Sequence, residues 1–236
     1  MLFCEPFLIS GSAAVPIAEG SINWETSFPG AQPSQLLWAA EDSAYKGDEF
    51  KYDFFDENIP TPTPLVGVST IGQNTFTSGI YNCDEYHYCY YSYTGGSNLQ
   101  IDAGAGGLDL GRRRIVLLVD NADVDIKSNI DFLNGSGLLL VVTDQDITVY
   151  DSVTSIKGLY VSDGDFNTCQ FNPNCPTTNQ LKVRGSVIAW GRVNPLRDLP
   201  DNTETPAEVF EFAPDQLLLF PPHLSDKKVL WTEVVP

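Results

Sequence analysis

Two continuous runs of apolar residues, 115–119 and 138–142, are the strongest hydrophobic signals along the chain. Each run ends in a turn rich in Asp, and a short alternating segment follows it, 124–126 after the first run and 147–149 after the second. Apolar, β-branched runs of this length that end in Asp/Asn turns are typical of strands and too short for helices. The pattern therefore predicts strand, turn and strand, twice in succession.

The turns between these strands repeat along the chain. Segments 119–124, 142–147 and 161–166 share one order of apolar residue, turn-forming residues, Asp and second apolar residue, and they begin 23 and 19 residues apart. A period of about 20 residues is typical of a solenoid, whose coils bury their apolar faces only by stacking. With a further run at 181–190, the repeat predicts an all-β fold: a single-stranded parallel β-helix (β-solenoid) over about 97–192, with short helical caps. A β-sandwich or jelly roll is the alternative, because it also has short, regularly spaced strands.

The rest of the chain is expected to cap the solenoid. Residues 1–64 predict an irregular N-terminal cap region, and residues 65–236 the β-helix with a C-terminal capping tail. Aromatic residues at helical spacing in 49–59 predict an amphipathic helix that plugs the N-terminal end, because an open coil exposes strand edges and core. The apolar tail segments 216–222 and 229–235 are expected to lie along the solenoid or to seal its C-terminal end.

Composition and charge narrow the range of partners. The 236 residues are 42% hydrophobic, which excludes a disordered chain, and their net charge of −18 argues against a nucleic-acid partner. The basic cluster Arg112-Arg113-Arg114 precedes a predicted strand and is interpreted as an edge guard or a partner of nearby Asp. No apolar run is long enough for a transmembrane helix, and the start lacks the features of a secretory signal. We expect a chain that begins after a processed or anchored segment, or a fragment.

Four of the five cysteines form two pairs with the same spacing. Cys83 and Cys89 bracket five residues, and so do Cys169 and Cys175. In an acidic chain rich in Tyr and Asn, such pairs predict two disulfides that staple loops, and hence an extracellular or cell-envelope location. Zinc binding is a weaker alternative, because the spacing is not C-x2-C and the chain has two histidines. Reduced structural thiols are another, and Cys4 has no evident partner.

Tyrosines surround the first cysteine pair. Alternation at 86, 88 and 90 places several rings on one face of a strand. A Tyr ring offers a flat apolar surface and a hydroxyl, which suits contact with surface glycans or other cell-surface proteins. Packing between coils is the alternative. The candidate ligand-binding residues are Tyr86, His87, Tyr88, Tyr90 and Tyr91.

The repeated turns stack acidic residues on one another. A hard cation relieves the repulsion of stacked carboxylates, so calcium is the one cofactor that the sequence suggests, and a solvated acidic face without metal is the alternative. The same carboxylates are weak candidates for catalysis, because Asp occupies turns for backbone reasons and the repeats offer only Lys127 and Lys157 as bases. The candidate metal ligands are Asp120, Asp123, Asp144, Asp146, Asp163 and Asp165.

The C-terminal part of the chain carries a resemblance. The string 185–191, Arg197-Asp198-Leu199, 206–210, Pro221-Pro222 and the terminal 231–236, with Pro214 and Leu217 between them, is similar to the C-terminal β-helix of uncharacterised bacterial cell-surface proteins, some of which look like accessory or tip components of pilus-like systems. The resemblance covers about residues 50–236 and brings no catalytic residue with it. With the predicted disulfides, it indicates an extracellular structural or adhesive surface protein that presents stapled loops. The alternative is a carbohydrate-active β-helix enzyme, a polysaccharide lyase or hydrolase.

Overall fold

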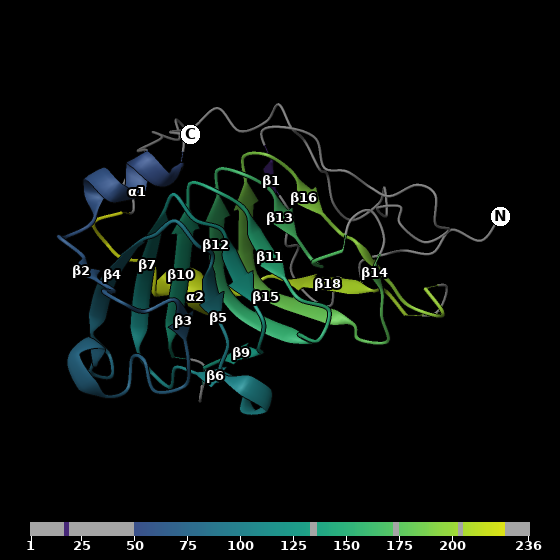
Figure 1. Cartoon of the computed structure of the whole chain (residues 1–236), viewed down its shortest axis with the longest axis horizontal. Coiled ribbons are helices and arrows are strands. Elements are labelled where there is room, and N and C mark those ends of the chain that lie inside the picture. Colours follow the sequence, from purple (N-terminus) through teal and green to yellow (C-terminus); the bar gives the residue numbers. More distant parts are fainter. Residues whose placement is uncertain (1–16, 19–49, 133–135, 172–174, 203–204, 225–236) are drawn as a thin grey trace, which may run out of the picture.

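The chain folds as a β-solenoid, as the repeat predicts. The computed structural model describes residues 17–18, 50–132, 136–171, 175–202 and 205–224. Strands dominate these residues, all of the strand pairs are parallel, and two short α-helices accompany them (Figure 1). Each coil contributes one strand to a longer sheet and one to a shorter sheet, which is the arrangement of a parallel β-helix.

The longer sheet has eight strands in the order β1-β15-β12-β10-β7-β4-β2, and β18 also pairs with β15. Neighbouring strands come from successive coils, so the sheet runs along the solenoid. The bounds are β1 (Ile17–Ala18), β2 (Thr63–Pro64), β4 (Tyr88–Thr94), β7 (Arg114–Asp120), β10 (Leu138–Thr143), β12 (Ser155–Ser162), β15 (Leu181–Ala189) and β18 (Glu208–Glu211).

The shorter sheet has six strands in the order β16-β13-β11-β8-β5-β3, and two further strand pairs, β14 with β17 and β6 with β9, stand apart from it. The bounds are β3 (Thr70–Ile71), β5 (Leu99–Ile101), β8 (Val124–Ile126), β11 (Ile147–Val149), β13 (Phe166–Asn167), β16 (Val193–Asn194), β6 (Leu108–Asp109), β9 (Ile130–Asp131), β14 (Cys175–Pro176) and β17 (Arg197–Asp198). The helices are α1 (Tyr52–Asn58), α2 (Pro214–Leu218) and the 3-10 turns η1 (Gly79–Tyr81) and η2 (Gly104–Gly106).

The turns that join the two sheets carry the sequence repeat, and the first turn is one residue longer than the next two. The strands align Val119 with Thr143 rather than with Val142, its equivalent in the repeat. Asn121 lies in this longer turn with a left-handed backbone (φ 55°), which Asn tolerates better than most residues. The buried hydroxyl of Thr143 donates to the carbonyl of Ala122 at 2.8 Å, so the longer turn leaves this oxygen paired.

Apolar side chains from both sheets fill the inside of the coils. The largest of them is Tyr160, which is fully buried, and its ring centroid lies 6.1 Å from that of Phe166. Its hydroxyl donates to the carbonyl of Lys157 at 3.0 Å, and burial raises the pKa of Tyr160 well above its usual range. Inward-facing residues of adjacent strands stack above one another, among them Ile115, Leu117 and Val119 of β7 and Leu139 and Val141 of β10.

The outer face of the longer sheet is apolar too, and other segments cover it. The outward-facing Val116 and Leu118 are fully buried in a second apolar cluster that includes Phe55 of α1. Helix α1 contacts β7 and β10 here, and the chain from 219 to 224 packs against the same cluster. A sheet buried on both faces has continuous apolar strands, which explains the unbroken runs of the sequence. The prediction that the helix plugs the N-terminal end is therefore wrong, because α1 lies along the side of the sheet.

Segments from both ends of the described chain complete the last coil. β15 pairs with β18 through residues 181–184 and with β1 through residues 188–189. Part of the predicted N-terminal cap thus pairs at the C-terminal end of the sheet. β2 also falls inside the expected cap region and forms the first strand of the sheet. The other residues before Phe50, with Cys4, and the tail from 225 onward lie outside the described residues.

Two charged side chains are buried together in this last coil. Arg197 donates through its guanidinium to four carbonyl oxygens, at distances between 2.7 and 2.9 Å. Glu208 accepts from the Thr168 hydroxyl at 2.7 Å and from the backbone N–H of Arg197 at 2.9 Å. Burial raises the pKa of Glu208 to about 7 and lowers the pKa of Arg197 to about 10. The four carbonyls belong to Tyr150, Val153, Thr168 and Asn179, so Arg197 ties successive coils together.

None of the helices in the described part of the chain is long and apolar enough to cross a membrane.

Candidate functional site

The first stapled loop is the best candidate for a functional site. Disulfides Cys83–Cys89 and Cys169–Cys175 are both formed, as predicted, with Cα–Cα distances of 5.9 and 6.2 Å. The loop closed by the first bridge exposes all four residues from Asp84 to His87. A loop that is covalently closed and points side chains into solvent is suited to recognition.

Hydrogen bonds hold the loop against the neighbouring coil. The backbone N–H of Tyr86 donates to the carbonyl of Arg112 at 3.0 Å, and that of Arg114 donates to the carbonyl of His87 at 3.2 Å. The Arg113 guanidinium donates through Nε to the carbonyl of Cys83 at 2.7 Å. These contacts extend the β4–β7 pairing past the start of β4. The loop is therefore preorganised by the sheet as well as by the disulfide.

Tyr86 is the most unusual residue of this loop. Its backbone is left-handed (φ 67°), a conformation that an aromatic residue rarely adopts, and its side chain is 52% exposed. The Arg112 guanidinium lies 5.4 Å from the ring centroid, within the range of a cation–π contact. Backbone strain of this kind concentrates at functional sites, where the surrounding structure maintains it.

The other predicted aromatic residues have three different environments. Tyr88 is half-buried on the outer face, and its hydroxyl donates to the carbonyl of Leu219 at 2.9 Å. Tyr90, two residues further on, is also half-buried, and its ring centroid lies 5.7 Å from that of His223. Tyr91 points into the core, and its hydroxyl donates to the carbonyl of Tyr81 at 2.7 Å. Tyr91 is therefore a core residue rather than a surface ligand residue, because a strand sends successive side chains to opposite faces.

The three consecutive arginines separate in the same way. Arg113 donates to the carbonyl of Cys83 in the loop, whereas Arg112 and Arg114 lie against the rings of Tyr86 and Tyr88, at 5.4 and 4.9 Å. The sequence interpretation as an edge guard missed this stacking. The sequence does show two Tyr and two Arg, each pair spaced two residues apart. Only the pairing of β4 with β7 reveals which Tyr faces which Arg.

The six predicted aspartates form two stacks, one at each side of the turn between the sheets. In one stack, two carboxylates accept from the backbone of the next coil, Asp123 Oδ1 from the N–H of Asp146 at 3.2 Å and Asp146 Oδ1 from the N–H of Asp165 at 2.7 Å, and Asp165 accepts from the side-chain amide of Asn194 at 3.1 Å. In the other stack, Asp144 Oδ1 accepts from the N–H of Asn121 at 2.9 Å and Asp163 Oδ1 from that of Tyr52 at 3.1 Å. Asp120 accepts from the side-chain amide of Asn121 at 2.9 Å.

These contacts give the aspartates a structural role. Burial raises the pKa of Asp146, helped by the nearby Asp165 and Asp123, and burial also raises the pKa of Asp163. Among the residues that the structure describes, no group of three or more His, Cys, Asp or Glu side chains converges as metal ligands would. The calcium hypothesis draws no support from this geometry, and the carboxylates serve as caps for backbone amides.

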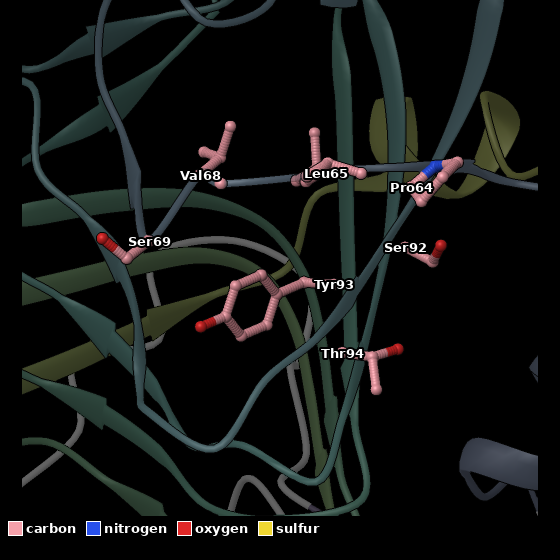
Figure 2. A pocket seen from close by; sticks show the side chains of 9 residues that line it. Pro64, Leu65, Val68, Ser69, Ser92, Tyr93 and Thr94 are labelled. Carbon is pink, nitrogen blue, oxygen red and sulfur yellow. The ribbon is translucent and has the colours of Figure 1, made fainter.

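Two hollows lie elsewhere on the surface. A pocket of about 430 Å³ lies between the first coil and the end of β4, lined by Leu65, Val68 and Tyr93 among others (Figure 2). A second, of about 310 Å³, lies on the outer face between Phe55 and Phe220 and is almost wholly apolar. Neither pocket is lined by a charged side chain.

The fold and the stapled loop define the class of this molecule, a disulfide-closed parallel β-solenoid. Comparisons of the chain with family models, with curated proteins and with solved structures found no match.

Proposed function

We propose that this protein is an extracellular or cell-envelope surface protein, structural or adhesive, that recognises a surface glycan or another surface protein through the loop of residues 83–89. The observation that carries the proposal is Tyr86, a strained, half-exposed aromatic residue at the tip of a disulfide-closed loop. A strained conformation costs stability, so a role at the surface explains why a large ring is kept there.

Preorganisation supports this assignment. A rigid loop loses little conformational entropy when it binds, and Tyr provides a large contact area with few rotatable bonds. Here the disulfide, the Tyr86 backbone bond and the Arg113 side chain fix the loop before any partner arrives. The two disulfides also support an oxidising environment such as the cell surface.

The test is binding of the purified, oxidised chain to an array of surface glycans and to intact cells. Tyr86→Ser is expected to lower the bound signal at least tenfold. Phe171→Ser is the matched control, because Phe171 is similarly exposed (55%) and lies in the other stapled loop. Equal binding by the Tyr86 and Phe171 variants would refute the assignment of the site to the first loop.

A further inference from the structure

We propose that the two stacked pairs, Arg112 with Tyr86 and Arg114 with Tyr88, form a binding site for the carboxylate of an acidic sugar. This inference rests on the proposed function and names the class of ligand. Both guanidinium groups lie against Tyr rings, and they belong to the run Arg112-Arg113-Arg114 of the sequence.

The two Arg–Tyr contacts are neighbours along the chain and across the strands. Tyr88 is the strand partner of Arg114 in the β4–β7 pairing, and Tyr86 bonds to the backbone of Arg112 one step before it. Arg114 begins β7, and Arg112 lies in the turn two residues before it, opposite the turn that holds Tyr86. Both Arg–Tyr contacts therefore lie where the stapled loop meets the start of β7.

Arg114 lacks an anion in the described part of the chain. Its Nε is buried without a hydrogen-bond partner there, no carboxylate of the described residues forms an ion pair with it, and its charge is met by the face of Tyr88 at 4.9 Å. Arg114 is half-buried, so a ligand carboxylate that reaches the exposed part of its guanidinium supplies the opposite charge that the described residues do not.

Arg112 is available as well. Its side chain is 40% exposed, and the carboxylate paired with it, that of Glu85, lies 4.0 Å away. Two arginines at the other end of the solenoid show the contrast: Arg184 binds Asp215 with two bonds of 3.0 and 2.7 Å, and Arg197 bonds to four carbonyls. Those two bind oxygen atoms of the fold at short distances, whereas Arg112 has the longer contact with Glu85 and Arg114 lies against the ring of Tyr88.

The chemistry favours an acidic sugar. Guanidinium groups bind planar carboxylates through paired hydrogen bonds, and stacking on an aromatic ring holds the fork in place. The apolar face of a sugar ring packs against an exposed Tyr ring such as that of Tyr86. Because the chain has a net charge of −18, long-range attraction does not collect anions on it, so any binding of an acidic glycan has to come from a local site.

The experiment uses the full, oxidised chain and three probes: oligogalacturonate, its methyl ester and dextran sulfate. We expect the acid to bind at least tenfold more tightly than the ester and the binding to weaken as salt rises. Arg112→Gln and Arg114→Gln are each expected to weaken binding of the acid about tenfold. Arg112→Lys keeps the positive charge and loses the planar pair of guanidinium donors. Its affinity for the acid is expected to lie between that of the Gln variants and that of the wild type.

Arg192→Gln is the matched control, because Arg192 is exposed in the last coil, away from the loop. Thermal melting of each variant checks that the fold is intact. Equal binding of acid and ester, or binding of dextran sulfate alone, would overturn the carboxylate site and leave the proposed recognition role standing. Retention of acid binding in both Gln variants would also overturn it. Absence of binding to any glycan or cell in the array experiment would instead count against the proposed function itself.

Discussion

The two disulfide loops of this protein have the same spacing and opposite surroundings. Cys83–Cys89 and Cys169–Cys175 each join residues six apart. The first loop exposes Tyr86 and His87 beside a solvated Arg112, whereas both cysteines of the second bridge are buried beside the coil that holds Arg197 and Glu208. The first loop thus exposes a run of four side chains, from Asp84 to His87, whereas the second bridge lies beside a buried charged network and its loop exposes Phe171.

The surroundings of each disulfide therefore determine whether the residues around it serve binding or stability. Around the first bridge, polar side chains lie on the surface, where they contribute little to stability and are free to bind. Around the second bridge, a buried ion-containing network depends on every partner, and removal of one leaves charge or carbonyl oxygens unpaired. Substitutions around the two bridges separate the role in stability from the role in binding.

Arg197→Leu should be the most damaging single change. It leaves four buried carbonyls without a donor and Glu208 without its compensating charge, which costs about 4 kcal/mol of unfolding free energy. Urea denaturation measures this loss. The control, Arg192→Leu at an exposed position, should change stability by no more than about 0.5 kcal/mol. A similar small change in both variants would show that the network is dispensable.

Stability should rise as the pH falls from about 8 to 5. Burial raises the pKa of Glu208 from its ordinary value of 4.5 to about 7, so the native state holds this proton more tightly than the unfolded chain does. The unfavourable free energy of the buried charge applies in full above pH 7 and disappears as the pH falls toward 4.5. The free energy of unfolding then rises by about 3 kcal/mol. Asp146 and Asp163, whose pKa values burial also raises, add in the same direction.

Glu208→Gln tests the origin of this dependence, because the amide keeps the shape and does not titrate. Melting temperatures between pH 5 and 8 should vary much less in the variant than in the wild type. If both proteins show the same slope, Glu208 is not the group responsible.

Removal of either disulfide should cost about 2 kcal/mol, since the two closed loops are of equal length. The double variants Cys83→Ser/Cys89→Ser and Cys169→Ser/Cys175→Ser should therefore melt alike. Their binding should differ: the first variant should lose affinity for its glycan through loss of preorganisation, and the second should keep it. Array binding and thermal melting on the same samples give both readouts, and equal affinities would remove the distinction between the two loops.

Tyr86→Gly should have the smallest effect on stability and a favourable one. Glycine adopts the left-handed backbone of this position without strain, which should raise the free energy of unfolding by about 1 kcal/mol. Binding should be lost, because the ring is removed. Asn121→Gly is the control, because Asn121 is the other non-glycine residue with a left-handed backbone in the described part of the chain, and Asn tolerates this backbone, so the gain in stability should be smaller. A destabilised Tyr86→Gly protein would mean that the ring serves the fold.

Local patterns in the sequence were enough for the fold class and the disulfides. The apolar runs at 115–119 and 138–142, the repeated Asp turns and the equal cysteine spacing each predict structure over short distances along the chain. The repeat even located the turns, although it misaligned the first coil by one residue at Val119. These features can be recognised in the sequence because strand preference, turn chemistry and loop closure are properties of neighbouring residues.

The candidate site was predictable only in part. The Tyr-rich stapled loop was evident, but the inward direction of Tyr91 and the stacking of Arg112 and Arg114 were not. Each depends on which residue of β4 faces which residue of β7, and a shift of one residue in register exchanges the two faces of a strand.

Residues close together along the chain thus define the strands, the coil period and the two disulfides of this protein. Tertiary structure alone decided that α1 and the chain from 219 to 224 lie along the outer face of the longer sheet, that Arg197 and Glu208 are buried together, and that two arginines stack on two tyrosines. The physical reason is that burial and charge pairing join residues far apart along the chain, and only the folded coils bring them within contact distance.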